Sequence, residues 1–365
     1  MKENNLKLEQ LDLSFLPKGL AGERREQLKK ALEGIKKIKW PIKAVVLGGG
    51  YKHKELTYNQ KSLGSDIDLF VFSNFIPFFW KKLLKIQEEI NQPVHFFHYR
   101  GVIPLFLRKS KTFWAYRLKQ EGIVLEGDKE ILRKIKARED NIPKIEALRI
   151  LFQTLVVWLC LAQLNSEKSK RNIDKFTILR SYLNIGESYL TFAGKLAPSY
   201  RERLNKIDEV AQEFNLKRDL VEKIKLGYKT KIAPLEMEEH EFSLLQVKKD
   251  CLEAINHLLS IYLKTNASLE EKLDFLGKEI RPKYLFNLAF FYFLRNIKGI
   301  RPKLFPAVFK YKITDLWKMV VYSEMGEKEK LFEILEKYFK VQKFSDETLI
   351  KIFEAHPSFS TVEIT

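Results

Sequence analysis

The sequence predicts an α+β fold in which a small α/β unit precedes a long, entirely helical region. Four short runs bounded by Gly, Pro or Asp have the β-branched or aromatic composition of strands, and all four lie between residues 43 and 128. An amphipathic helix pattern over 78–92 separates the second run from the third. From about residue 141 onward the strand patterns cease and helical periodicity dominates the chain.

The expected elements follow in chain order. Apolar positions at helical spacing predict a helix over 20–38, with Gly34 as a mild break. Strands are expected at 43–50, 65–72, 93–99 and 122–128. Helices are then expected at 143–164, 171–195, 197–214, 217–228, 238–264, 267–278, 283–296, 313–323, 327–339 and 345–355. We therefore divide the chain into an N-terminal helical segment (1–40), an α/β domain (41–138), a helical bundle domain (139–265) and a C-terminal helical domain (266–365).

Composition excludes several classes of protein. Two cysteines, Cys160 and Cys251, cannot form a disulfide framework, so we expect buried thiols and a cytoplasmic location. The N-terminus lacks the uninterrupted apolar stretch of a signal peptide, and the most apolar window, 150–164, is too short for a transmembrane segment. The formal net charge of +18 favours polyanionic partners such as nucleotides, nucleic acids, or anionic glycans and lipids, although a generally solvated basic surface gives the same total.

Two aspartates interrupt an otherwise apolar strand pattern, 65-SDIDLFVF-72. Side chains alternate along a strand, so Asp66 and Asp68 point to one face with their Cβ atoms roughly 7 Å apart. Oxygen ligands at this separation suit Mg²⁺ or Mn²⁺, which also leave positions for water and substrate phosphates. A D-x-D pair is common, however, and a strand end where Ser65 and Asp66 turn the chain is the alternative.

Three glycines end the preceding strand pattern. Gly48, Gly49 and Gly50 expose backbone N–H groups without side chains in the way, which suits the close approach of a triphosphate. Lys52, followed by a histidine and a second lysine, adds positive charge for the same anion. The alternative is a glycine-rich turn that is needed only for positive φ.

An apolar strand, a small-residue turn and a second apolar strand carrying D-x-D resemble the DNA polymerase β superfamily of nucleotidyltransferases. The residues Gly49, Gly50, Tyr51 and Glu55, followed by SDIDL, are similar to a group of bacterial and archaeal predicted nucleotidyltransferases. The segment 113–128 resembles that superfamily's closing strand. The segment 142–152 looks like the first helix after that group's catalytic domain.

The resemblance implies a small mixed-sheet nucleotidyltransferase domain with fused helical domains. It implies that Asp66 and Asp68 hold Mg²⁺ or Mn²⁺, and that the glycine turn holds a nucleoside triphosphate. In such enzymes a nucleoside monophosphate passes to an acceptor hydroxyl and pyrophosphate leaves. The residues that we expect to contact the nucleotide are Gly48, Gly49, Gly50, Lys52 and Ser65.

The chain departs from the family pattern on the third strand, 93-PVHFFHYR-100. The family places a third carboxylate there, whereas this strand has no acid and His95 or His98 occupies that place. Three interpretations stay open: an enzyme with His95 as general base, an enzyme whose third acid comes from elsewhere, such as Glu55 or Glu126, and a degenerate site that binds nucleotide or polyanion without turnover.

The helical remainder carries weaker indications of function. Residues 171–207 resemble a helical domain often fused to such nucleotidyltransferases, where Lys175, Tyr200 and Arg203 either contact a base or phosphate or simply complete a bundle. The aromatic and basic segment 283–312 fits a bundle core better than a base-stacking or membrane-facing surface. The sequence does not select the acceptor, which ranges from nucleic acid to an anionic glycan or lipid, nor the oligomeric state.

Overall fold

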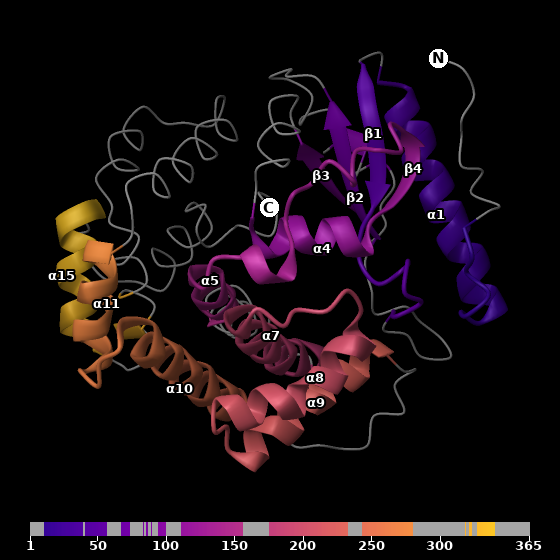
Figure 1. Cartoon of the computed structure of the whole chain (residues 1–365). Helices are drawn as coiled ribbons and strands as arrows, with labels where there is room; N and C mark the ends of the chain where they lie inside the picture. The colour runs from indigo at the N-terminus through magenta and orange to yellow at the C-terminus, as the bar shows by residue number, and fades with distance from the viewer. Residues whose placement is uncertain are drawn as a thin grey trace.

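A computed structural model describes residues 11–38, 41–56, 67–73, 83, 85, 86, 89, 94–99, 111–155, 175–232, 243–279, 318, 321, 322 and 327–339. Only the backbone is described at 94–99, 175, 176, 277–279, 328, 332, 335 and 337–339. These residues form an α+β structure with one small sheet and mostly helices (Figure 1). The coarse fold class predicted from the sequence is thereby confirmed.

The sheet has four strands in the order β3-β2-β1-β4. The strands are β1 (Ile42–Leu47), β2 (Ile67–Ser73), β3 (Val94–Tyr99) and β4 (Ile123–Gly127). Strand β1 pairs antiparallel with both β2 and β4, whereas β2 and β3 run parallel, so the sheet is mixed. Three of the strands lie within two residues of the ranges that the apolar runs and their Gly, Pro and Asp boundaries predict, whereas β1 ends at Leu47, three residues before the predicted end at Gly50.

The two faces of the sheet are covered differently because side chains alternate along each strand. On one face Val45, Leu47, Leu69 and Val71 are buried against α1 (Lys18–Lys36), which contributes an apolar stripe of Leu28, Ala31, Leu32 and Ile35. On the other face Ala44, Val46 and Phe72 join the core of the helices that follow. The sheet is thus the middle layer of the structure (Figure 1).

One helix differs from the sequence-based expectation. The strand expected at 122–128 is present as β4, but the preceding residues of the segment 113–128, which resembles a closing strand, form helix α4 (Phe113–Glu121), which the sequence analysis did not predict. Thr112 caps this helix by accepting the Ala115 N–H at 3.2 Å, and the helix stops before Gly122. Phe113, Tyr116 and Leu118 of this helix are buried in the core that the sheet shares with the following helices.

The remaining helices agree with the predicted ranges where they are described. They are α5 (Ile145–Gln153), α7 (Lys175–Ala193), α8 (Tyr200–Glu213), α9 (Arg218–Ile232), α10 (Leu244–Leu263), α11 (Leu269–Glu279) and α15 (Lys328–Phe339), preceded by a 3₁₀ turn, η2 (Glu139–Asn141). The predicted helices 283–296 and 345–355 lie outside the described residues, and only a few helical residues are described within 78–92 and 313–323. Helix α4 lies between the sheet and helices α5 and α7 (Figure 1).

Cys251 is a buried thiol on α10, as expected, and its sulfur donates to the Leu151 carbonyl at 3.6 Å. Cys160 lies outside the described residues. Across the described ranges, no helix combines the length and apolar character required to traverse a bilayer.

Candidate functional site

The glycine turn follows directly from the end of β1. Gly49 has a φ of +77°, a conformation that glycine adopts without strain. A Cβ on Gly50 would overlap the backbone carbonyl of Glu55, and the Glu55 N–H donates to the Gly50 carbonyl at 2.9 Å, which closes the turn. Two of the three glycines are therefore needed for the shape of the loop itself, so the conformational explanation applies to them whether or not they bind a phosphate.

Asp68 lies beside this turn, at the start of β2. The Gly48 N–H donates to the Asp68 backbone carbonyl at 2.8 Å, which extends the β1–β2 pairing by one residue. Ile67 and Leu69 are buried on the α1 face, so by alternation Asp68, which is half-buried, belongs to the opposite face with Phe70 and Phe72. Asp66 and Ser65 lie outside the described residues.

The β2–β3 register selects between the two histidines of the third strand. Asp68 pairs with His95, whereas His98 pairs with Val71 three positions further along. Paired positions on neighbouring strands share a face of the sheet, so position 95 belongs to the face of Asp68 and position 98 to the opposite face. Residue 95 therefore occupies the place where the resemblance implies a third acid.

Neither alternative third acid stands beside Asp68. Glu55 is 2% exposed, and its two carboxylate oxygens accept the backbone N–H groups of Tyr200 at 2.7 Å and Arg201 at 3.0 Å. Glu126 is on β4, two strand spacings or roughly 10 Å across the sheet from β2, and it pairs with Lys36 at 3.3 Å. Both acids have structural partners instead.

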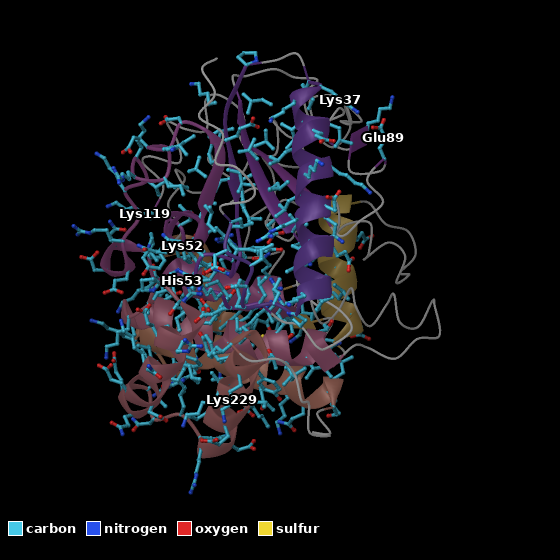
Figure 2. All side chains as sticks on the ribbon, turned by 90° about the vertical axis from the view of Figure 1, so that its right-hand side faces the viewer. Lys37, Lys52, His53, Glu89, Lys119 and Lys229 are labelled. Carbon is cyan, nitrogen blue, oxygen red and sulfur yellow. The ribbon has the colours of Figure 1, made fainter. Side chains whose placement is uncertain are left out.

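The basic residues after the glycines have three different environments. Lys54 pairs with Asp12 at 2.6 Å. His53 is half-buried, with Nε2 3.2 Å from the Gln120 carbonyl at the end of α4. Lys52 is exposed and makes no ion pair within the described structure. Figure 2 shows Lys52 and His53 at the level where the sheet meets the helices, and Lys52 is an exposed cation two residues beyond the turn.

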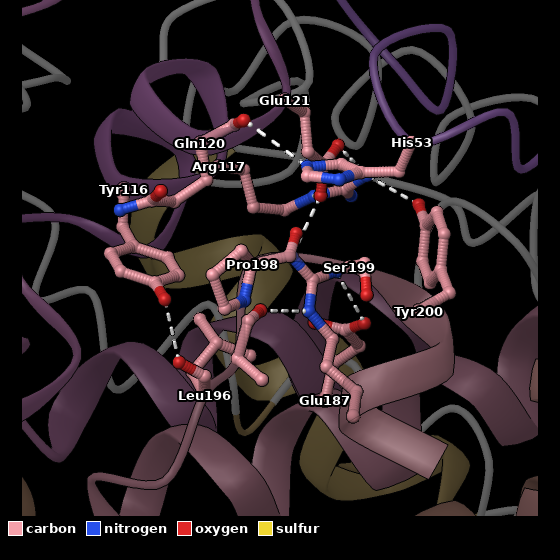
Figure 3. Close-up of polar contacts among 12 residues, drawn as sticks. His53, Tyr116, Arg117, Gln120, Glu121, Glu187, Leu196, Pro198, Ser199 and Tyr200 are labelled. Atoms are coloured by element: carbon pink, nitrogen blue, oxygen red, sulfur yellow. Dashed lines mark hydrogen bonds and ion pairs between the residues drawn. The ribbon is translucent and has the colours of Figure 1, made fainter. Parts of the chain in front are cut away.

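Two residues considered for ligand contact belong to the core instead. Arg203 is completely buried and donates to the Ala197 carbonyl at 2.6 Å, to Glu187 at 3.0 Å and to Glu121 at 2.7 Å (Figure 3). Tyr200 is 5% exposed. The interpretation that these residues complete the bundle is therefore correct, and their reach toward a base or phosphate is excluded by burial. The side chain of Lys175 lies outside the description.

Arg117 connects this buried cluster to α4. Its guanidinium donates to both oxygens of Glu121, at 2.8 and 2.7 Å, and to the Tyr200 hydroxyl. It also lies over the ring of Trp114, 5.0 Å from the centroid. We call Arg117, Glu121, Glu187, Tyr200 and Arg203 the buried ion network; nothing in the local sequence reveals it, because its members come from α4, α7 and α8.

The buried ion network makes the fold less stable at acidic pH. Burial alone would raise the pKa of the Glu121 carboxyl, but Arg117 and Arg203 outweigh it and lower the pKa from 4.5 to about 2. Because the folded-state pKa lies below the unfolded value, this carboxylate stabilises the fold above its unfolded pKa, and the contribution is lost as the pH falls through the folded value. The difference corresponds to about 3 kcal/mol.

We therefore expect the free energy of unfolding to decrease between about pH 5 and pH 2, and Glu121→Gln to remove part of that slope. Urea unfolding at a series of pH values measures both curves. Glu130→Gln is the matched control, because Glu130 forms an exposed pair with Arg133. An E121Q slope equal to that of the wild type would contradict this account.

The Gly50 position gives a second prediction. Gly50→Ala forces the turn open because the new Cβ meets backbone rather than a movable side chain, and we expect a loss of about 1–3 kcal/mol in unfolding free energy. Gly22→Ala is the control, since Gly22 is exposed within α1 with nothing within 4 Å of its Cβ position. That change should stabilise by about 0.5–1 kcal/mol. Thermal unfolding measures the two effects, and a G50A protein as stable as the wild type would refute the prediction.

A divalent cation fits this site in its donor chemistry. Asp68, with Asp66 beside it in sequence, supplies the oxygen ligands that Mg²⁺ prefers, whereas a histidine at position 95 is a poorer Mg²⁺ ligand than a carboxylate. In the described part of the chain, no three His, Cys, Asp or Glu side chains gather closely enough to bind a metal ion.

Comparison with protein-family models, with curated proteins and with solved structures gave no match to this chain.

Proposed function

We propose that this protein is a Mg²⁺- or Mn²⁺-dependent nucleotidyltransferase that transfers a nucleoside monophosphate from a nucleoside triphosphate to an acceptor hydroxyl. The hydrogen bond from the Gly48 N–H to the Asp68 carbonyl at 2.8 Å supports this proposal most directly, because it joins the candidate phosphate-binding turn to the acidic strand. The mixed pairing of β1, β2 and β3 also agrees with the small mixed sheet that the resemblance implies.

Each residue has a chemical task in the proposed reaction. The backbone N–H groups of Gly49 and Gly50 and the Lys52 ammonium bind the triphosphate, whereas the Gly48 N–H, which we also expected to contact it, already donates to the Asp68 carbonyl. Asp66 and Asp68 hold the divalent cation, which when bound neutralises the negative charge of the phosphates. Ser65 lies next to this pair in sequence and offers a hydroxyl to a phosphate oxygen.

The proposed chemistry is an in-line displacement at the α-phosphorus. The acceptor oxygen forms a bond to that phosphorus, the bond from the α-phosphorus to the bridging oxygen breaks, and pyrophosphate leaves with the electron pair. The acceptor hydroxyl loses its proton to a general base, and His95 is the residue that we propose for this role because its position pairs with Asp68.

The alternative function is a non-catalytic nucleotide- or polyanion-binding protein. One observation favours it: Glu55 and Glu126, the two acids that might replace the missing third carboxylate, are engaged with α8 and with Lys36. A site with two acids and a histidine can retain phosphate binding while turning over slowly or not at all.

Calorimetry with each of the four ribonucleoside triphosphates, with Mg²⁺ and with Mn²⁺, distinguishes these functions when it is combined with a pyrophosphate-release assay. Acceptors in that assay should include an RNA with a free 3′ hydroxyl, a sugar phosphate and the protein alone. Binding with metal-dependent pyrophosphate release supports the transferase, and binding without release supports the alternative. The absence of nucleotide binding in every condition would refute the transferase and the nucleotide-binding form of the alternative, and would leave polyanion binding alone.

A further inference from the structure

Glu55 joins the glycine turn to a helix that begins 145 residues later in the chain. Its carboxylate accepts the N–H groups of Tyr200 at 2.7 Å and Arg201 at 3.0 Å, which are the first two residues of α8. These N–H groups have no partner within their own helix, and the positive end of the helix dipole favours a carboxylate there. Glu55 is 2% exposed, so water competes little for these bonds.

The turn is consequently fixed at both ends. At its start the Gly48 N–H donates to the β2 backbone at Asp68. At its end the Glu55 N–H donates to the Gly50 carbonyl at 2.9 Å while the Glu55 side chain binds α8. The backbone N–H groups between these points are therefore held in one arrangement before any ligand arrives.

Helix α8 is itself a rigid support for this contact. The Tyr200 hydroxyl accepts from Arg117 on α4, and Arg203 one turn later binds Glu121 on α4 and Glu187 on α7 (Figure 3). The Tyr116 hydroxyl also donates to the Leu196 carbonyl, just before α8, at 2.7 Å. The buried ion network thus holds the N-terminus of α8 in place. Because Glu55 is hydrogen-bonded to that N-terminus, the end of the glycine turn is held in place as well.

We infer that Glu55 is a positioning residue: it uses the N-terminus of α8 to hold the glycine turn in a phosphate-binding shape, so that the helical region takes part in nucleotide binding without touching the nucleotide. This inference rests on the proposed function for its consequence in binding, whereas the contact itself stands on geometry. Preorganised donors cost no reorganisation when the ligand binds, and a misplacement of about 1 Å is expected to lose up to about 100-fold in activity.

A purely structural role would be an ordinary helix cap, and the two roles predict different results. Loss of a cap destabilises the fold, whereas loss of a positioning contact also loosens the turn. Ser243→Ala provides the matched control, because the Ser243 hydroxyl caps α10 by accepting the Gln246 N–H at 3.1 Å, on a different helix. Glu55→Gln is the conservative variant, since one amide oxygen still accepts one of the two N–H groups.

The experiment compares hydrogen exchange of the peptide covering residues 48–56, and nucleotide affinity, in the full-length wild type, E55A, E55Q and S243A. We expect exchange in this peptide to be roughly tenfold faster in E55A, intermediate in E55Q and unchanged in S243A. The dissociation constant for the nucleoside triphosphate with Mg²⁺ should rise roughly tenfold in E55A, with partial recovery in E55Q.

Exchange in E55A that matches S243A would overturn the inference, whatever the affinities are. Faster exchange in E55A, in a chain whose wild type binds no nucleotide, would support the contact and refute the proposed function alone. Faster exchange with unchanged affinity would overturn the role of Glu55 in nucleotide binding. The failure of the inference and the failure of the proposed function are therefore distinguishable.

Discussion

Replacing Asp68 by alanine should reduce pyrophosphate release by roughly a thousandfold or more, because it removes a ligand of the cation that stabilises charge in the transition state. Asp66→Ala should have a comparable effect if the two carboxylates act on one cation. Asp68 is half-buried at the end of a strand rather than within an apolar core, so we expect its removal to change the thermal midpoint of unfolding little.

Rates at saturating nucleotide and metal measure this effect, and the thermal midpoint shows whether the variant is folded. Glu126→Ala is the matched control, because Glu126 is an acid of the same sheet whose partner is the exposed side chain of Lys36. We expect E126A to keep the wild-type rate. A folded D68A protein with the rate of E126A would eliminate the transferase proposal.

Replacing Arg203 by methionine should destabilise the fold by about 3–5 kcal/mol, because it leaves the buried carboxylates of Glu121 and Glu187 short of a positive partner. Arg203 is fully buried and Glu187 is 0% exposed as a residue, so water cannot take over the lost bonds. The Glu121 carboxylate keeps Arg117, which makes Glu187 the group that loses most.

Urea unfolding monitored by circular dichroism measures the loss. Lys195→Met is the control. Lys195 pairs at 2.9 Å with Glu209 and at 2.6 Å with Glu213, two exposed acids of α8, the helix that also carries Arg203. Such surface pairs contribute about 1 kcal/mol or less. Similar losses in R203M and K195M would show that the buried ion network does not stabilise the fold as described.

The sequence predicts the sheet well because its strands are short apolar runs with clear boundaries. The run Ala44–Leu47 is fully buried on both faces, and such a run ending in glycines leaves few alternatives. Helix α4 was not predicted because its segment lacks such a boundary. Its Phe, Trp and Tyr residues have strand propensity, and they directly precede the apolar run of β4, so the pattern showed no boundary between the helix and the strand.

Part of the candidate site could also be predicted from the sequence, and part of it could not. The neighbourhood of Gly48 and Asp68 follows from two antiparallel strands joined end to start, which the sequence pattern contains. The engagement of Glu55 with α8 does not, because an acid at position 55 carries no signal for a partner at position 200. Ser199 followed by Glu202 does mark the start of a helix, but not which side chain binds its free N–H groups. The four-part division of the chain remains a prediction.

The apolar layer beneath the sheet has a consequence for how this protein can be divided. Ala44, Val46 and Phe72 belong to the same continuous core as Leu151 of α5 and Leu190 of α7. A fragment that ended at residue 138 would expose this apolar face of the sheet to solvent. The exposed face would favour self-association over folding. The sheet and the helices that share this core are therefore expected to fold and unfold together, rather than as separately stable pieces.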